Sequence, residues 1–317
     1  MLNAKSILIT GGNGFLGKHL VDALVKEEKV LRSKIFTPSR KEYDLRKEED
    51  VAKMFATLTP DILVHLATTA QGINYNKEHP ATLYFDHSMM NNLLMHYAVK
   101  YAVKKFITIG TALAYPFDAN IPLKEESMWS GPCEPTIATI GVTSRSMLAQ
   151  SQAYRKEFGL NAIYVIPANL YGPGDHFSST HAHVIPANIQ KFHKAKQEKT
   201  PIVEIWGSGK ASREFLYVTD ATRAIIECIK NYNGAEPLNL ASGEEIKISE
   251  LVKQISKIVG YKGKIIWNST KPEGTLRRCL DNSQMRKKIN FKPRVLFKQG
   301  IRNTIEWYLK NQKQFIY

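Results

Sequence analysis

Short apolar runs alternate with amphipathic stretches through the first half of the chain. The runs SILIT, KIFTPS, DILVHLA and KKFITIG are short and rich in β-branched residues, which is typical of strands. Between them, GKHLVDALVKEEKV, RKEEDVAKMFATL and SMMNNLLMHYAVKYA carry apolar residues at helical spacing. This alternation predicts an α/β fold with a parallel, doubly wound sheet of Rossmann type, whose ligands bind along one edge.

The alternation loosens after about residue 172. Later segments, among them PIVEIWGSGKASREFLYV, ISELVKQISKIVG and FKQGIRNTIEWYLKNQ, follow one another less regularly. We expect residues 1–172 to form a dinucleotide-binding domain, to which a later segment at about 214–243 returns. Residues 173–317 are then mainly a smaller, discontinuous substrate-binding cap over the carboxyl ends of the strands. The cleft between the two parts is the expected site.

Length and composition agree with this architecture and exclude several classes of protein. A chain of 317 residues, 43% of them hydrophobic, can bury a full core. The longest apolar runs are far shorter than the ~20 residues of a membrane helix. The N-terminus enters the first predicted strand without a signal-peptide pattern, so we expect a soluble, cytoplasmic protein with no membrane partner.

Cysteine usage and charge add little to this picture. The three cysteines, Cys133, Cys228 and Cys279, are widely spaced, so neither a disulfide framework nor a metal site is predicted. The net charge of +15 would suit an anionic partner. Lysines are scattered along amphipathic stretches such as YAVKYAVKK and are not concentrated in one arm, so nucleic-acid binding is not expected.

The stretch ITGGNGFLGKHL predicts a dinucleotide-binding loop, because its glycines follow a strand and precede a helix. Gly11 permits the tight turn, Gly14 lets a pyrophosphate approach the backbone, and Gly17 allows close packing of helix on strand. The other residues expected to contact the cofactor lie in this loop or at the end of the DILVHLA run: Phe15, Leu16, Leu66 and Ala67.

The end of the second predicted strand indicates which dinucleotide binds. A carboxylate there would bind a ribose 2′-hydroxyl, whereas an arginine would suit a 2′-phosphate. The segment KIFTPSRKEYDL has Ser39 and Arg40 at this point. NADP is therefore the favoured cofactor, and NAD stays an alternative.

Several motifs together resemble the extended short-chain dehydrogenase/reductases, the NAD-dependent epimerase/dehydratase family. They are the GxxGxxG loop, NLYGP, HVIPA, WGSGKASREFLYV and KPEGT. The likeness is greatest to GDP-L-fucose synthases, which are GDP-4-keto-6-deoxymannose 3,5-epimerase-4-reductases, and it covers residues 5 to about 310. It implies a GDP-sugar or another nucleotide-sugar as substrate, and a homodimer formed by helices at about 85–104 and 140–158.

The resemblance also implies roles for individual residues. In that family a strand-end Ser or Thr touches the sugar, a Tyr-x-x-x-Lys pair performs the redox step, and a Cys and a His perform the epimerisations. The strand-end hydroxyl falls on Thr111 and the histidine on His183. Arg213 is expected to bind the diphosphate, because a guanidinium can contact two phosphate oxygens at once. The implied substrate-binding positions are Asn169, His183, Val184, Trp206, Arg213 and Lys271.

Three chemical positions depart from the family pattern. The family cysteine falls on Leu113, the tyrosine on Ile140 and the lysine on Ser144, counting back from NLYGP without gaps. Isoleucine carries no proton to donate, and serine lacks the positive charge that lowers the pKa of a tyrosine. Leucine cannot take a proton from carbon beside a keto group. A register shifted by one residue pairs Gly141 with Arg145 and still provides no tyrosine.

These observations leave three hypotheses open. The first is a nucleotide-sugar oxidoreductase or epimerase with altered acid/base groups, acting on a GDP-linked keto-deoxyhexose or heptose. Its candidate proton donors are Tyr115 and His183, which we expect to face the cleft. The second is a catalytically degenerate homologue that serves as a nucleotide-sugar-binding or dinucleotide-binding regulatory or partner subunit. The third, a nucleic-acid binder, rests on charge alone.

Overall fold

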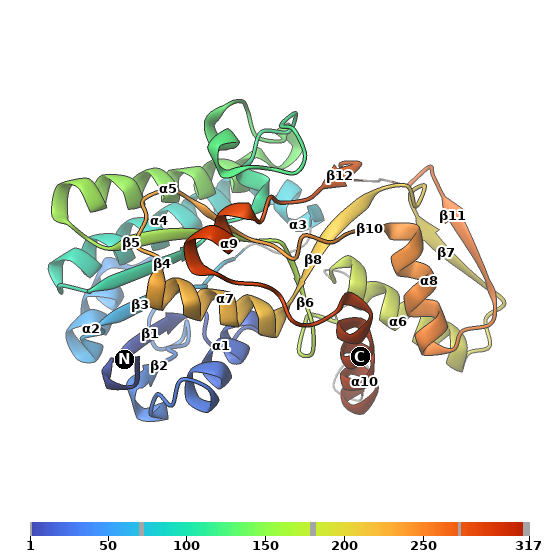
Figure 1. Ribbon diagram of the computed structural model, residues 1–317, viewed down its shortest axis with the longest axis horizontal. Helices are drawn as coiled ribbons and strands as arrows, with labels where there is room; N and C mark the ends of the chain where they lie inside the picture. The colour runs from blue at the N-terminus through green and yellow to red at the C-terminus, as the bar shows by residue number, and fades with distance from the viewer. Residues whose placement is uncertain (1, 70–72, 178–181, 272–273, 313–317) are drawn as a thin grey trace.

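The computed structural model describes residues 2–69, 73–177, 182–271 and 274–312. Within these ranges, six parallel strands form the main sheet in the order β2-β1-β3-β4-β5-β9 (Figure 1). They are β1 (Ile7–Thr10), β2 (Ile35–Phe36), β3 (Ile62–His65), β4 (Lys105–Ile109), β5 (Ala162–Pro167) and β9 (Leu238–Leu240). The predicted doubly wound α/β sheet is confirmed.

The strand order places a topological switch beside β1. Ile7 pairs with Ile35 of β2 on one side and with Ile62 of β3 on the other. The chain therefore leaves β1 in one direction and returns on its other side. In open α/β sheets the ligand cleft forms at such a switch, outside the carboxyl ends of the strands.

Helices cover both faces of the main sheet. On one face α1 (Phe15–Lys26) packs against α7 (Val218–Asn231), and on the other α4 (Pro80–Lys100) packs between α2 (Glu48–Leu58) and α5 (Ala138–Phe158), as Figure 1 shows. No helix in the described part of the chain is long and apolar enough to cross a membrane. The remaining helical turns are α3 (Ile73–Glu78), η1 (Leu2–Ala4), η2 (Arg32–Lys34), η3 (Ala112–Ala114), η4 (Glu125–Trp129) and η5 (Pro135–Ile137).

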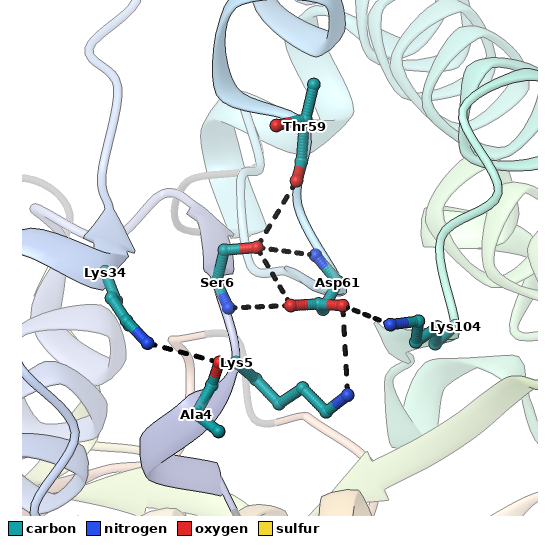
Figure 2. A network of polar contacts seen from close by, with 7 residues as sticks. All are labelled: Ala4, Lys5, Ser6, Lys34, Thr59, Asp61 and Lys104. Carbon is teal, nitrogen blue, oxygen red and sulfur yellow. Dashed lines mark hydrogen bonds and ion pairs between the residues drawn. The ribbon is translucent and has the colours of Figure 1, made fainter.

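A polar network holds the amino ends of three neighbouring strands (Figure 2). The Asp61 carboxylate accepts from the Ser6 backbone N–H at 3.0 Å, from Ser6 Oγ at 3.2 Å and from Lys104 Nζ at 2.7 Å. These residues directly precede β1, β3 and β4. The pKa of Asp61 is lowered to about 2, mainly by the hydrogen bond from Lys104. The carboxylate thus fixes the strand edge opposite the expected site.

The cap has its own sheets and its own apolar core. β8 (Ser212–Tyr217) pairs with β6 (Asn169–Tyr171), β10 (Glu245–Lys247) and β12 (Arg277–Arg278), and β7 (Ile202–Trp206) pairs with β11 (Lys264–Asn268). The helices of the cap are α6 (Val184–Gln197), α8 (Ile248–Val259) and α10 (Phe297–Asn311). Buried side chains from these elements form one cluster, which includes Ile189, Phe192, Leu251 and Ile305 and is joined by Phe177 from the segment after β6.

The chain passes between the two parts more than once. β6 pairs with β8 in the cap sheet, although it lies before the boundary expected at residue 172. The chain then returns through α7 and β9 to the main sheet, and α9 (Ser283–Ile289) packs against both. Segments distant in sequence therefore meet where the two parts join.

Candidate functional site

The glycine loop lies against the end of β3. Gly11 has a φ of +71°, a backbone conformation that residues with a side chain rarely adopt. A Cβ atom on Gly11 would lie 2.7 Å from the Ala67 backbone nitrogen and 2.8 Å from the Leu66 carbonyl carbon. The structure thus brings Gly11, Leu66 and Ala67 together at the switch beside β1.

The same loop leads closely into α1. A Cβ on Gly17 would lie 2.4 Å from the Gly11 carbonyl oxygen, so only glycine fits there. Gly14 is the N-cap of α1 and supplies no side-chain cap to its first amides. Free amides at a helix N-terminus bind phosphate. This cradle fits the pyrophosphate of a dinucleotide.

Phe15 and Leu16 begin α1 immediately after the loop. The Phe15 ring contacts His19 edge-on, with centroids 5.7 Å apart, and His19 Nε2 lies 2.7 Å from the Pro173 carbonyl oxygen. Leu16 is partly buried against the main core. The start of α1 is therefore attached to the segment that follows β6.

The segment after β2 runs beside the glycine loop. Asn13 Nδ2 donates to the Thr37 carbonyl at 3.3 Å. β2 ends at Phe36, shorter than the KIFTPS run, and Pro38 has no N–H with which to extend the ladder. The Arg40 side chain is 64% exposed, and its Nε lies 3.9 Å from Asp44 Oδ2. Its guanidinium is accessible to an anionic ligand.

The end of β4 meets the first turns of α5. Thr111 caps η3, and its Oγ1 accepts from the Leu113 amide at 3.3 Å. The Thr111 amide donates to Ser144 Oγ at 3.2 Å. Ile140 and Ser144 are both buried. Position 144 therefore points at the strand end that carries Thr111.

The register shifted by one residue would put Gly141 and Arg145 at the positions of the redox pair, and these two residues have other contacts. A Cβ on Gly141 would lie 2.5 Å from the Leu113 carbonyl oxygen, so α5 packs on η3 through this glycine. Arg145 donates through Nε to the Ala114 carbonyl at 2.6 Å and through Nη1 to the Gly131 carbonyl at 2.8 Å. Arg145 therefore holds the 115–134 loop, while Ser144 contacts the strand end.

Leu113 lines a pocket between the main domain and the cap. From the main domain, Ala112 and Glu134 also line it. From the cap, Thr275, Arg277 and Arg278 complete the wall. The Arg277 guanidinium is paired with Glu245, at 2.7 Å from Nη2 to Oε2. Glu134 and Arg278 were not among the residues expected from the sequence.

Tyr115 also lines this pocket, but its hydroxyl points into the protein, so its expected role as a proton donor stays a prediction. Its side chain is 2% exposed, and its hydroxyl donates to Asn239 Oδ1 at 2.7 Å. Burial raises the pKa of Tyr115, and the nearby Glu125 carboxylate raises it further. The chain turns inward after η3, and Asn239 on β9 accepts the hydrogen bond of the phenol inside the protein.

His183 is a protonatable residue at the start of α6. Its side chain is 65% exposed, and Nδ1 lies 3.6 Å from Oδ1 of the buried Asp175. That carboxylate raises the pKa of His183. Asp175 Oδ1 also accepts from the His176 amide at 2.7 Å, and its buried Oδ2 has no hydrogen-bond partner among the described residues. Asp175 follows NLYGP directly, which is the signal that could have identified it.

Two of the substrate-binding residues that the resemblance implies lie together in the cap. Trp206 ends β7 with its side chain exposed, and Lys271 Nζ lies 5.7 Å from the centre of its indole. Arg213 is half-buried on β8 and pairs in register with Arg278 of β12. The cap thus presents an aromatic face with a cation and, on neighbouring strands, two guanidinium groups.

Asn169 and Val184 contribute mainly to the cap itself. The Asn169 side chain donates to the Glu214 carbonyl at 2.8 Å, which joins β6 to β8. Val184 is the first residue of α6 and packs against the cap core. Within the described residues, these contacts position the elements around the cleft.

Comparisons with known proteins agree with this geometry. The model of the NAD dependent epimerase/dehydratase family matches residues 7–241. A probable GDP-L-fucose synthase 1 of Oryza sativa subsp. japonica is 35% identical over 306 residues, covering 96% of this chain and 92% of that protein. The GDP-L-fucose synthase of Escherichia coli K12 is 30% identical and covers 99% of both chains.

Solved structures show the same similarity. A GDP-mannoheptose C4 reductase from Campylobacter jejuni, with NADP bound, superposes with a TM-score of 0.88 at 26% identity, covering 98% of this chain and 99% of that one. A GDP-L-fucose synthetase from Naegleria fowleri, also bound to NADP, gives a TM-score of 0.88 at 27% identity, covering 98% and 95%.

Proposed function

The chain belongs to the NAD-dependent epimerase/dehydratase family, and on that basis we propose that it binds NADP(H) and a GDP-linked keto-deoxy sugar in the cleft between its two parts. The names of the relatives support the substrate class, since they include GDP-L-fucose synthases and a GDP-mannoheptose reductase. The sugar is a keto-deoxyhexose or a heptose.

The cofactor half of the site is the glycine loop with its neighbours. The loop at Gly11–Gly17 would hold the pyrophosphate at the N-terminus of α1. Arg40, exposed beside this loop, would pair with a 2′-phosphate and so favour NADP over NAD. NADPH, when bound, supplies a hydride for reduction of a carbonyl.

The sugar-nucleotide half is provided by the cap. Arg213, with Arg278 on the next strand, would pair with the diphosphate, because guanidinium groups bind phosphate oxygens in a fork. The Trp206 ring offers an exposed aromatic face to a base, with Lys271 above it. Thr111, at the end of β4, would contact the sugar.

The His183–Asp175 pair carries the proposal that the site is catalytic. A ketone that receives a hydride needs a proton on its oxygen, and Ile140 cannot donate one. His183 is exposed, and the buried Asp175 carboxylate favours its protonated form. We therefore assign His183 as the proton donor, in place of both the missing tyrosine and the buried Tyr115.

Cofactor turnover tests this proposal. The wild-type protein, supplied with NADPH and a panel of GDP-keto-sugars, is expected to oxidise NADPH with at least one of them. His183→Asn should lower kcat about 100-fold, since a positioned acid contributes 10²–10⁴-fold. Calorimetric binding of NADPH is the control and should not change. Tight ligand binding by the wild type without turnover on any sugar would contradict the catalytic assignment.

The burial of Ile140 and Ser144 favours a second candidate function. Both positions of the redox pair are packed into the protein, as in a homologue that retains binding and has lost chemistry. Such a protein would serve as a regulatory or partner subunit of an active sugar-nucleotide enzyme. Stimulation of a partner's rate by wild-type protein and equally by His183→Asn would support this function over catalysis.

A further inference from the structure

The space beside Ser144 is filled by a residue of β5. The Tyr164 hydroxyl lies 2.5 Å from Ser144 Oγ. A Cβ on Gly110 would lie only 2.1 Å from the same hydroxyl, so the phenol rests directly on the backbone at the end of β4. Tyr164 is 1% exposed and Ser144 is 6% exposed. The contact between them is therefore sealed from solvent.

This contact also holds a residue of the proposed sugar site. Ser144 Oγ accepts from the Thr111 amide at 3.2 Å while it contacts the Tyr164 hydroxyl. The three groups belong to α5, the end of β4 and β5. These hydrogen bonds therefore fix the position of Thr111 just after β4.

A lysine at position 144 would not fit beside Tyr164. Its stem adds two carbons and an ammonium beyond the position of the serine oxygen, and Tyr164 and the backbone at Gly110 fill the space there. Arg145, the next residue along α5, acts on Tyr164 as a positive charge and would repel an ammonium there. Burying an ammonium without a carboxylate partner is costly.

From this geometry we infer that Tyr164 determines whether the family's redox pair can operate in this protein. With Ser144 it positions Thr111, and its ring occupies the room that a lysine at 144 requires. Replacing Ile140 and Ser144 by the family residues is therefore insufficient, and Tyr164 must also become small. The inference rests on the proposed function, because it concerns the reaction of that site.

Three variants of the full chain test the inference through activity. They are Ile140→Tyr/Ser144→Lys, the same pair with Tyr164→Ser, and Tyr164→Ser alone. With NADPH and GDP-4-keto-6-deoxymannose, we expect the triple variant to oxidise NADPH about 100-fold faster than the double variant. The double variant and Tyr164→Ser should not exceed the wild type. Equal rates for the double and triple variants would overturn the inference.

A double-mutant cycle, measured by urea unfolding and here called the stability cycle, tests the same contact without any reaction. Ser144→Lys should lower the urea midpoint by about 1 M in the wild-type background. It should lower the midpoint much less in the Tyr164→Ser background. Ser151, also buried on α5, provides a matched control, since the cost of Ser151→Lys should be the same in both backgrounds. Equal costs for Ser144→Lys in the two backgrounds would overturn the inference.

Binding measurements separate this inference from the proposed function. If the wild type binds neither NADPH nor GDP, the proposed function fails, and the stability cycle still decides the packing claim. If the triple variant binds both ligands as tightly as the wild type does and stays inactive, the inference about Tyr164 fails while the proposed site stands.

Discussion

Among the residues that the structure describes, Asp175 supplies the carboxylate that favours protonation of His183. Asp175 is buried and lies 3.6 Å from Nδ1, and it raises the pKa of His183 above its ordinary value of 6.5. The acidic form therefore persists to higher pH than in a free histidine, and it is lost as the pH rises through the raised pKa. Proton donation by His183 should decrease over the same pH range.

Removing that carboxylate should shift the pH profile in one direction. In Asp175→Asn the imidazolium loses its counter-charge, so the alkaline limb of kcat/KM for NADPH oxidation should move to lower pH. The matched control is Asp22→Asn, which removes an exposed carboxylate on α1 and should leave the profile unchanged. A limb that stays in place in Asp175→Asn would show that Asp175 does not act on the proton donor.

The register of α5 could be predicted from the sequence better than the direction of individual side chains. The helical period places position 144, and not 145, at the end of β4, and the Ser144 to Thr111 hydrogen bond agrees with that register. The direction of Tyr115 could not be predicted, because its partner Asn239 is 124 residues away. Tyr164 was missed for the same reason: its importance comes from a neighbouring element, and no motif marks it.

The amino edge of the main sheet is stabilised by one carboxylate that joins three strands. Asp61→Asn weakens the hydrogen bonds to Ser6 and Lys104 and should lower the free energy of unfolding by about 1–2 kcal/mol at neutral pH. Asp22→Asn, in an exposed pair with Lys26, should cost at most about 0.5 kcal/mol. NADPH binding should be unaffected by Asp61→Asn, because the network lies at the opposite edge.

The pH dependence of this effect has a defined sign. The pKa of Asp61 falls from 3.8 to about 2 in the folded protein, so the carboxylate stabilises the fold above pH 3.8. That contribution is lost as the pH falls through about 2. Urea unfolding at decreasing pH should show the wild type and Asp61→Asn converging. A difference that stays constant down to the lowest pH would contradict the role given to this network.

Regular elements could be predicted from the sequence, whereas short ones could not. The amphipathic stretches that form α1, α2 and α4 were predicted as helices, because each repeats its apolar positions over several turns. In the cap, β12 has two residues, and β6 and β10 have three. Strands of this length carry no periodicity, and pairing with a distant strand defines them. The cap sheet therefore emerged only from the structure.

The surface formed by α4 and α5 is the expected dimer interface. The two helices pack side by side and expose large apolar side chains, with Tyr84 49%, Phe85 58% and Val142 42% accessible. Exposed apolar groups on neighbouring elements are typical of an interface. We expect the protein to be a homodimer through this surface.

A charge on that surface should separate the protomers. Phe85→Glu should convert the dimer to a monomer, because an interface cannot bury an unpaired carboxylate without a large penalty. The control is Leu31→Glu, at a position that is 62% exposed and lies outside both helices. Analytical ultracentrifugation measures the result. A wild type that is monomeric, or a Phe85→Glu variant that stays dimeric, would contradict the assignment of this face.

Ligand binding by the intact protein tests the central claim, that this chain has kept both halves of a nucleotide-sugar reductase site while losing the usual redox pair. Calorimetric titration of NADPH, NADH and GDP into the wild type should show that NADPH and GDP both bind and that NADPH binds more tightly than NADH. In Arg213→Met, the affinity for GDP should fall about 10- to 100-fold while that for NADPH is unchanged. A wild type that binds neither NADPH nor GDP, or GDP binding that does not depend on Arg213, would contradict the account.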